Sequence, residues 1–414
     1  MRVFKFGGAS VRDAKGIENV ASIIRSYSTK KLLVVVSAMG KTTDALEQIV
    51  SFSQSGKNIT SQIDQLVQYH HETLRALFPD NHAVYNDFKK IIEQLQTEVA
   101  RKGDWDQIYD QVVSLGEMIS SRILSHYLIL NGMPVEWIDA RQYVRTDDTF
   151  REGKINWAET TLTLQPLKAI LSQKIILTQG FLGSTLDGLT TTLGREGSDF
   201  SAAIFASCLD ADSVTIWKDV PGVMNADPKR LSTASVFEEL PYKEAAEMTY
   251  YGAAIIHPKT IKPLANKGIP LRVRSFVDPA LPGTVIHECK VARILPLIVF
   301  KGNQCLISCQ VTDFSFINEK QIGIVLQTLA DFNIKINVMQ NSAISFSFCV
   351  DYREDKTLKL IDHLGKHFEV FYNTGLTLVT IKNYDAELYQ KYHNVSGVLL
   401  EQSSRSTLQV LLKS

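Results

Sequence analysis

Five consecutive apolar residues, Leu32–Val36, constrain the fold of this chain more than any other stretch. A strand with apolar side chains at every position has no face left for water, and such strands belong to parallel sheets that are covered on both sides. A short strand is also expected over residues 2–6, and the segment between the two carries apolar residues at a 3.6-residue spacing. The order strand, helix, strand predicts an α/β domain with a mainly parallel sheet.

The turn after the first expected strand, Gly7-Gly8-Ala9-Ser10, is the first candidate anion site. Glycine lets backbone N–H groups approach an anion closely, and Lys5 adds a compact positive charge beside them. A lone Gly-Gly pair carries little information, but its position directly after a first strand favours a phosphate-binding turn.

A second candidate loop lies within Gly188–Ala206, where small and hydroxylated residues lead into an apolar helix. A helix start offers free N–H groups and a positive dipole end, and Arg195 adds a fork of donors that suits a carboxylate or a phosphate. Asp199 either caps this helix or orients a lysine or a metal-bound water. The alternative is an ordinary strand–loop–helix connection with a solvated arginine.

Gly40-Lys41-Thr42 imitates the end of a P-loop, but Val35 replaces the earlier glycine of that motif, inside the strand itself. We therefore reject a P-loop. Ser37 and Thr43 are interpreted as hydroxyls beyond the carboxyl end of a strand, where α/β sheets bind their ligands.

Residues 44–131 are helical in character, and the last periodic segment, 105–130, contains Gly116-Glu117 between apolar neighbours. A buried carboxylate there requires a cation, whereas a surface-facing glutamate is the commoner arrangement, and the sequence alone favours the surface. The other expected helices of this region span 59–78 and 83–101.

Polar residues follow a further expected strand over 213–217. Lys218 comes at its end and Lys229 in the next polar loop, and each can reach a nucleotide or remain a solvated lysine. His257 is interpreted as structural, because nothing near it in sequence forms a base–nucleophile pair.

The character of the chain changes after a Pro- and Gly-containing segment at 278–283. From about residue 297, strand-like segments alternate with short helices and no glycine-rich loop occurs. We expect a catalytic domain over 1–285, with a helical insertion over about 52–130, and an appended α+β region over 297–414 for binding or dimerisation.

Composition excludes several classes of protein. The 414 residues contain 44 basic and 44 acidic side chains, so no overall field recruits nucleic acid. No apolar run is long enough to span a membrane, and the first residues do not resemble a signal peptide. Five scattered cysteines include Cys305 and Cys309 on one face of an expected strand, but a second pair at zinc-ligand spacing is missing. We expect buried thiols in a soluble cytoplasmic protein.

Four motifs in order resemble the aspartokinases of the amino-acid kinase family. They are Lys5-Phe6-Gly7-Gly8-Ala9-Ser10-Val11, Ser114-Leu115-Gly116-Glu117, Thr191–Arg195 with Gly197-Ser198-Asp199, and Trp217–Val223. The region from about 297 is similar to the tandem ACT domains of that family, with an abbreviated second repeat. No homoserine dehydrogenase region follows, so the resemblance implies a monofunctional enzyme, folded as a three-layer sandwich with a mainly parallel sheet and followed by an α+β ACT-like region.

The resemblance implies ATP- and Mg²⁺-dependent phosphorylation of the β-carboxylate of L-aspartate, the first step toward lysine, threonine and methionine. It implies that Glu117 receives the substrate ammonium and Arg195 its α-carboxylate, with Thr43 and Ser198 nearby. Lys5 and Asp199 take the catalytic roles, Asp199 by orienting Lys5. The residues implied at ATP are Lys5, Gly7, Gly8, Ser10, Lys218, Asp219, Met224 and Lys229. No protein ligand is assigned to Mg²⁺.

The sequence departs from the motifs of that family at four positions: Ala9, Glu196, Met224 and Ala254, where many members have Thr or Ser, Gly, Tyr and Lys. Lys218 replaces a common threonine, and we hypothesise that it supplies the positive charge missing at Ala254.

In the ACT-like region Lys320, Asn337 and Ala343 stand where lysine-sensitive relatives tend to have Gly, Asp and Glu. Feedback by lysine is therefore expected to be weak, altered or absent. The resemblance implies a possible amino-acid effector and a homodimer or larger assembly, and neither nucleic acid nor a membrane as a partner.

Two other functions remain open. One is a kinase for glutamate, carbamate or UMP, which Glu117 and the ACT-like tail disfavour. The other is a non-catalytic amino-acid sensor, which the combined presence of Lys5, Glu117, Arg195 and Asp199 disfavours.

Overall fold

The computed structural model describes residues 1–27, 31–253, 256–291, 294–313, 315–393 and 395–413. The chain divides into two compact units. The first comprises Met1–Val223, Val236–Ala246 and Ile255–Val291, and the second comprises Met224–Ser235, Glu247–Ala254 and Ala292–Ser414. The catalytic domain was expected over 1–285, but two short segments of that range, Met224–Ser235 and Glu247–Ala254, belong to the second unit together with the C-terminal residues.

The first unit is built on an eight-stranded sheet in the order β3-β4-β2-β1-β7-β9-β10-β8. All its pairs are parallel except β9 with β10, which confirms the expected mainly parallel sheet. The strands are β1 Arg2–Phe6, β2 Leu32–Val36, β3 Val135–Trp137, β4 Ile175–Gln179, β7 Ser213–Lys218, β8 Glu239–Pro241, β9 Leu271–Ser275 and β10 Thr284–His287.

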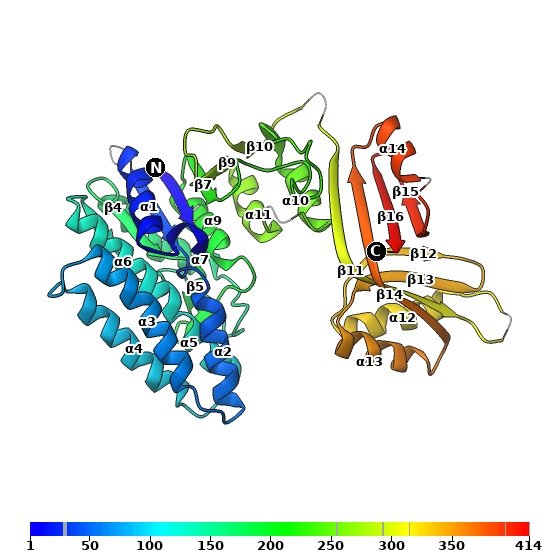
Figure 1. Ribbon diagram of the computed structural model, residues 1–414, viewed down its shortest axis with the longest axis horizontal. Helices are drawn as coiled ribbons and strands as arrows, with labels where there is room; N and C mark the ends of the chain where they lie inside the picture. Colours follow the sequence, from blue (N-terminus) through cyan, green and yellow to red (C-terminus); the bar gives the residue numbers. More distant parts are fainter. Residues whose placement is uncertain (28–30, 254–255, 292–293, 314, 394, 414) are drawn as a thin grey trace. The chain divides into compact units, whose positions relative to one another are not determined.

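Helices cover both faces of this sheet. Every residue of β2 and of β4 is buried, as the apolar run in β2 predicted. Helix α9 packs on β1, β2 and β7 and also against α11, whereas α6 packs on β2, β3 and β4 and against α1 (Figure 1). These helices are α1 Ala14–Ser26, α6 Leu115–Leu130, α9 Gly197–Leu209 and α11 Pro258–Lys267.

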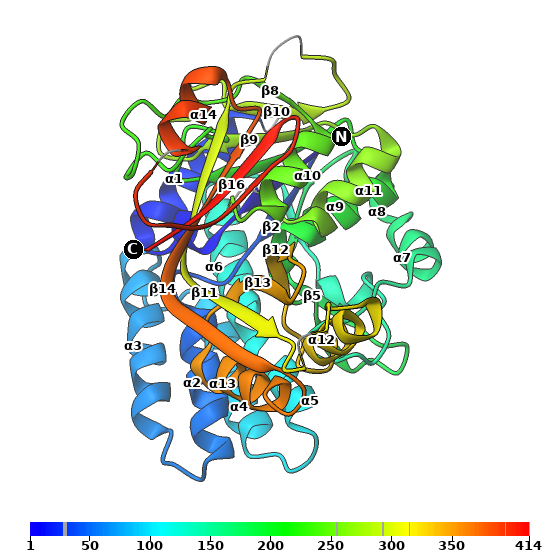
Figure 2. The same ribbon diagram turned by 90° about the vertical axis from the view of Figure 1, so that its right-hand side faces the viewer.

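The helical region between β2 and β3 contains α2 Thr42–Gln54, α3 Thr60–Leu77, α4 Val84–Val99, α5 Trp105–Val113 and α6. Figure 2 shows α2 to α5 extending away from the sheet. The helical segment expected over 105–130 is confirmed, and it is divided at Ser114 into α5 and α6. The Ser114 hydroxyl donates to the Gln111 carbonyl (2.9 Å), a local bond that competes with the helix ladder.

Short elements complete the first unit. A β5–β6 hairpin pairs Leu182 with Thr192 and Ser184 with Thr190. The bounds are η1 Gly8–Val11, η2 Ala140–Gln142, α7 Trp157–Leu164, α8 Leu167–Ile170, β5 Leu182–Ser184 and β6 Thr190–Thr192; α10, Tyr242–Tyr250, continues into the second unit.

The second unit holds a six-stranded antiparallel sheet in the order β12-β13-β11-β14-β16-β15. This is the expected α+β ACT-like region, with α12 and α13 following in the order β11-α12-β12-β13-α13-β14. The bounds are β11 Leu297–Gln310, α12 Glu319–Asp331, β12 Ile336–Asn341, β13 Ser345–Asp351, α13 Glu354–Leu364, β14 Glu369–Lys382, α14 Ala386–His393, β15 Val398–Ser403 and β16 Thr407–Lys413.

Cys305 and Cys309 lie in the apolar core of this second unit, both fully buried among residues such as Phe348 and Leu360. Cys208 and Cys349 are buried as well, so the expectation of buried thiols holds for four of the five cysteines, whereas Cys289 is half-buried. Among the helices of the described residues, none is both long and apolar enough to cross a membrane.

Candidate active site

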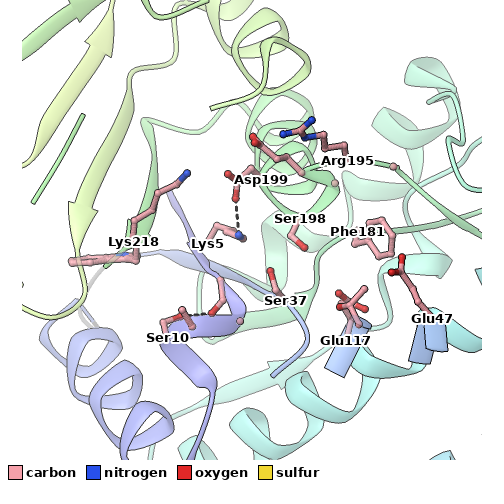
Figure 3. Close-up of a pocket in the computed structure, with 18 of the residues that line it drawn as sticks. Lys5, Ser10, Ser37, Glu47, Glu117, Phe181, Arg195, Ser198, Asp199 and Lys218 are labelled. Atoms are coloured by element: carbon pink, nitrogen blue, oxygen red, sulfur yellow. Dashed lines mark hydrogen bonds and ion pairs between the residues drawn. The ribbon is translucent and has the colours of Figure 1, made fainter. Parts of the chain in front are cut away.

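The carboxyl ends of β1, β2 and β7 meet at one edge of the sheet, because these strands are parallel neighbours. A cavity of about 700 Å³ opens at this edge, a size typical of small-molecule sites. Of the residues predicted for the site it is lined by Lys5, Gly7, Gly8, Ser10, Thr43, Glu117, Arg195, Ser198, Asp199, Lys218 and Asp219. Figure 3 shows several of these side chains around the cavity.

The two loops that follow β1 and β2 are fastened to each other. The Gly40 N–H donates to the Gly8 carbonyl (3.0 Å). A Cβ atom at Gly8 would lie 2.7 Å from the Ala38 carbonyl oxygen, so only glycine allows this approach. Ser10 is fully buried and its hydroxyl donates to the Gly7 carbonyl (2.6 Å). The predicted phosphate-binding turn is therefore a rigid feature that the neighbouring loop holds.

Lys5 and Asp199 form a buried ion pair at the centre of the cavity. The Lys5 Nζ atom lies 2.7 Å from Asp199 Oδ1, and the two side chains are 12% and 5% exposed. Asp199 lies in the first turn of α9. The sequence left open whether Asp199 caps the helix or orients a lysine or a metal-bound water, and the structure shows it in contact with a lysine. Because the pair joins β1 to α9, it fixes the Lys5 ammonium beside the glycine turn.

Glu117 is buried at the start of α6, so the surface-facing position favoured by the sequence alone is wrong. The residue is 3% exposed. Gly116 explains why: a Cβ atom there would contact Ala38, Leu46 and Thr42 at 3.0–3.2 Å, so the glycine lets α6 approach the loop after β2. The Ala38 N–H donates to Glu117 Oε1 (3.2 Å).

The other carboxylate oxygen of Glu117, Oε2, is buried and has no hydrogen-bond partner among the described residues. Burial raises the pKa of this carboxyl to about 8, and the Ala38 N–H and the Lys5 charge offset only part of that rise. The cavity thus contains a buried carboxyl group that a ligand cation can complete.

Arg195 is exposed on the loop before α9, at the cavity wall. Its neighbour Glu196 adopts a left-handed conformation (φ 54°) and accepts the His257 N–H through Oε2 (2.8 Å). Glu196, the acidic residue that departs from the family motif, therefore has a hydrogen-bond partner in His257. His257 itself accepts the Lys259 N–H at the start of α11 (3.1 Å), which confirms its structural role.

Sequence reasoning missed one side of the cavity, which Glu47, Tyr109, Arg151 and Phe181 line. The Tyr109 hydroxyl donates to Glu47 Oε1 (2.5 Å), and the Arg151 guanidinium lies over the Tyr109 ring (4.0 Å to its centre). Arg151 is held in a left-handed conformation (φ 68°). These residues come from α2, α5 and two separate loops, and no motif in the sequence links them.

Asp110 explains how this side is positioned. It is fully buried on α5 and accepts the N–H groups of Arg151 and Thr192 (both 2.9 Å) and the Thr192 hydroxyl (2.6 Å). One carboxylate therefore fastens the loop of Arg151 and the β5–β6 hairpin to α5.

A buried histidine, His70, contacts Thr42 at the end of the loop after β2. His70 Nδ1 lies 2.8 Å from the Leu66 carbonyl and therefore donates, which leaves Nε2 to accept from the Thr42 hydroxyl (3.2 Å). Burial lowers the pKa of His70 to about 4, so the ring is neutral near pH 7.

Two of the predicted site residues are not among those that line the cavity. Met224 and Lys229 belong to the second unit and are not among the residues that line it, so their place at a nucleotide stays a prediction. Ala254 falls outside the described residues.

The cavity has two chemically distinct parts. Lys5, Lys218 and the glycine turn form a cationic part, and the carboxylates of Glu117 and Glu47 lie in another part (Figure 3). An arrangement of this kind accommodates a ligand with both anionic and cationic groups.

The family model "Amino acid kinase family" matches residues 1–275. The chain therefore belongs to the amino acid kinase family. Within it, the chain is 31% identical to lysine-sensitive aspartokinase 3 of Escherichia coli strain K12, over 84% of this chain and 78% of that protein. It is 30% identical to aspartokinase 1, chloroplastic, of Arabidopsis thaliana, over 89% of this chain and 67% of that protein. These similarities place it among the aspartokinases.

A solved structure of E. coli aspartokinase III in complex with aspartate and ADP, in the R-state, matches 100% of this chain and 96% of its own, with a TM-score of 0.84 and 27% identity. Other relatives are much longer. A bifunctional aspartokinase/homoserine dehydrogenase 2 of A. thaliana chloroplasts is 34% identical over 69% of this chain, and the match covers 32% of that protein. The chain thus spans about a third to a half of the length of the bifunctional relatives it matches.

Proposed function

We propose that this chain transfers the γ-phosphoryl group of ATP to the β-carboxylate of L-aspartate, giving 4-phospho-L-aspartate and ADP. The observation that carries the proposal is the buried Oε2 atom of Glu117, which lines the same cavity as the Lys5–Asp199 pair. Burying a carboxylate without a partner is costly, and an amino-acid ammonium group removes that cost. The names of the aspartokinase relatives support the choice of substrate.

The rest of the substrate is assigned to residues around Glu117. Arg195 can hold the α-carboxylate in two-point geometry, and its exposed position on a loop lets it follow the ligand. Thr43 and Ser198 line the same cavity and supply hydroxyl groups. Together these residues orient the β-carboxylate toward Lys5.

The phosphate groups are assigned to the cationic part of the cavity. Lys5 and the N–H groups of Gly7 and Gly8 hold the transferring phosphoryl group, and Asp199 positions the Lys5 ammonium. The Ser10 hydroxyl donates to Gly7 in the structure, so its contribution is to shape the turn. Lys218 and Asp219 line the nucleotide side of the cavity; Met224 and Lys229 are assigned there by resemblance alone.

The reaction needs no general base. An aspartate side chain has an ordinary pKa of about 3.9 and is already ionised at neutral pH. Its oxygen forms a bond to the γ-phosphorus while the bond from that phosphorus to the bridging oxygen breaks, and ADP leaves. What the protein must supply is alignment and charge stabilisation, which the rigid turn and the Lys5–Asp199 pair provide.

Mg²⁺ fits the cavity because its rim presents Asp219, an exposed carboxylate, to an ion that keeps several waters and binds mainly phosphate oxygens. When bound, the ion neutralises phosphate charge. We assign it no protein ligand.

The proposal places the reaction in the cytoplasm, at the first step of lysine, threonine and methionine biosynthesis, in a homodimer or larger assembly. It also includes weak, altered or absent inhibition by lysine. Asn337 supports this part: its Oδ1 accepts from Lys301 (2.9 Å) and its Nδ2 donates to Gln304 (2.6 Å) and Asp351 (3.0 Å), so its polar atoms are engaged within the unit. A relative, E. coli aspartokinase III, was solved with lysine.

A hydroxylamine-trapping assay with ATP, Mg²⁺ and either L-aspartate or L-glutamate tests the proposal. We expect aspartyl hydroxamate from the wild type, and a rise of roughly 30-fold or more in the KM for aspartate in Glu117→Gln, from about 2–5 kcal/mol for a lost buried charge pair. Glu93→Gln, an exposed glutamate on α4, is the control. Binding of aspartate or ATP without any product would overturn the catalytic proposal and favour a sensor.

A further inference from the structure

Three metal-binding side chains meet at the edge of the eight-stranded sheet, outside the catalytic cavity. Strand β8 is the edge strand and pairs in parallel with β10, with Glu239 opposite Val285 (Figure 2). Paired residues of neighbouring strands share a face of the sheet, and so do residues two apart on one strand. The register therefore brings His287 to the face of Glu239, and Cys289 follows two residues later.

The distances suit one shared ion. One ligand atom each of Glu239, His287 and Cys289 lie within 4.8 Å of one another. The His287 Nε2 atom lies 3.7 Å from Glu239 Oε1, which is too long for a hydrogen bond. In a tetrahedral zinc site, bonds of about 2.0–2.3 Å separate the ligand atoms by roughly 3.3–3.8 Å. The imidazole and the carboxylate thus lie close to, and slightly beyond, the spacing of a nitrogen and an oxygen ligand of zinc.

A second observation points to a missing partner for the imidazole. The Nε2 atom of His287 is buried, and within the described ranges it makes no hydrogen bond. The carboxylates of Glu239 and Glu288 lie near the Cys289 thiol. The surroundings are therefore negative, which attracts a cation, and a bound metal deprotonates a coordinating thiol.

We propose that Glu239, His287 and Cys289 form a zinc-type site that joins the edge strand β8 to the segment after β10. One thiolate, one imidazole and one carboxylate is a donor set of zinc and similar borderline metals, whereas Mg²⁺ and Ca²⁺ require oxygen donors. The fourth position belongs to water. None of the three residues lines the catalytic cavity, so this site is independent of the proposed kinase activity.

The site has a structural consequence for the first unit. Strand β8 has only three residues, and Cys289 lies two residues before Val291, where the chain leaves this unit. A metal bound by residues from both segments adds a link that backbone pairing over three residues does not supply. We expect zinc to slow amide hydrogen exchange over residues 285–291.

Titration of the full chain with Co²⁺, in a non-thiol reductant, tests the site. We expect one equivalent to give a thiolate-to-cobalt charge-transfer band that Zn²⁺ displaces. Cys289→Ser should abolish the band. His287→Gln and Glu239→Gln should each lower the affinity for the metal at least tenfold, because loss even of a residue that only supports a ligand costs about 10–100-fold.

His393→Gln is the matched control, since His393 also contacts a glutamate, Glu401, at 2.7 Å, but without a cysteine in its sequence neighbourhood. Its charge-transfer band should equal that of the wild type. Circular dichroism verifies that each variant is folded. No charge-transfer band in the folded wild type, or a band that survives Cys289→Ser, would overturn the assignment.

Discussion

Replacing Glu117 with glutamine is expected to stabilise the free protein while weakening aspartate binding. The unfolded chain holds this carboxyl near its ordinary pKa of 4.5, and burial raises the pKa in the folded state to about 8. Between these values the folded state keeps a proton that the unfolded state releases. The free energy of unfolding of the wild type therefore falls as pH rises through this range.

The magnitude follows from the same two values. Each pH unit above 4.5 costs the wild type about 1.4 kcal/mol, so the penalty reaches about 3 kcal/mol at pH 7 and levels off near pH 8. Glutamine has the same shape and carries no ionisable group, so Glu117→Gln escapes this penalty. The protonated carboxyl and the amide leave the same buried atom without a partner, and that cost therefore largely cancels between them.

Thermal unfolding between pH 5 and 8.5 measures the difference. The melting temperature of Glu117→Gln should exceed that of the wild type by an amount that grows with pH, to roughly 5–10 °C at pH 7. Glu93→Gln should differ from the wild type by little and equally at every pH. Saturating L-aspartate at pH 8 should stabilise the wild type far more than Glu117→Gln. A difference between the two proteins that does not change with pH would refute the reasoning.

Three further changes probe other parts of the site. Lys218→Thr should raise the KM for ATP strongly, because a positive charge leaves the nucleotide side of the cavity; steady-state kinetics with an unchanged KM would contradict this. Asp199→Asn should lower kcat by up to about 10²-fold with little change in the KM for aspartate, because Lys5 loses the anion that positions it; an equal loss in both parameters would point to a binding role. Asp110→Asn should lower the free energy of unfolding by about 1–3 kcal/mol and expose the loop of Arg151 to proteolysis, since an amide cannot accept all three hydrogen bonds; an unchanged digestion pattern would count against that anchor.

Much of the site could be predicted from local sequence. The sequence of Gly7-Gly8 after a strand, and that of the loop before α9, each indicate a particular backbone geometry. Parallel pairing of the strands then brings their carboxyl ends to one edge of the sheet. For that reason Lys5 and Asp199, 194 positions apart in the sequence, meet at 2.7 Å. These motifs indicated which residues gather around the cavity, and their roles stay proposals.

The environment of Glu117 could not be predicted in this way. The sequence shows a charge between apolar residues, and its burial depends on how closely α6 approaches the loop after β2, which Gly116 permits. Likewise, the sequence drew attention to Cys305 and Cys309 for zinc, and both lie in an apolar core. The zinc-type site proposed instead combines Cys289 with Glu239, 50 residues earlier in the chain.

The sequence by itself determined the periodic elements, the parallel sheet, the glycine turns and the family to which this chain belongs. These properties depend on backbone preferences and on apolar spacing, which act over a few residues. Only the tertiary structure decided that Glu117 is buried with a raised pKa, that Asp110 fastens Arg151 to the cavity wall, and that the side chains of Glu239, His287 and Cys289 lie close together. Each of these depends on which distant segments pack together, because burial and the pairing of charges are properties of neighbours in space.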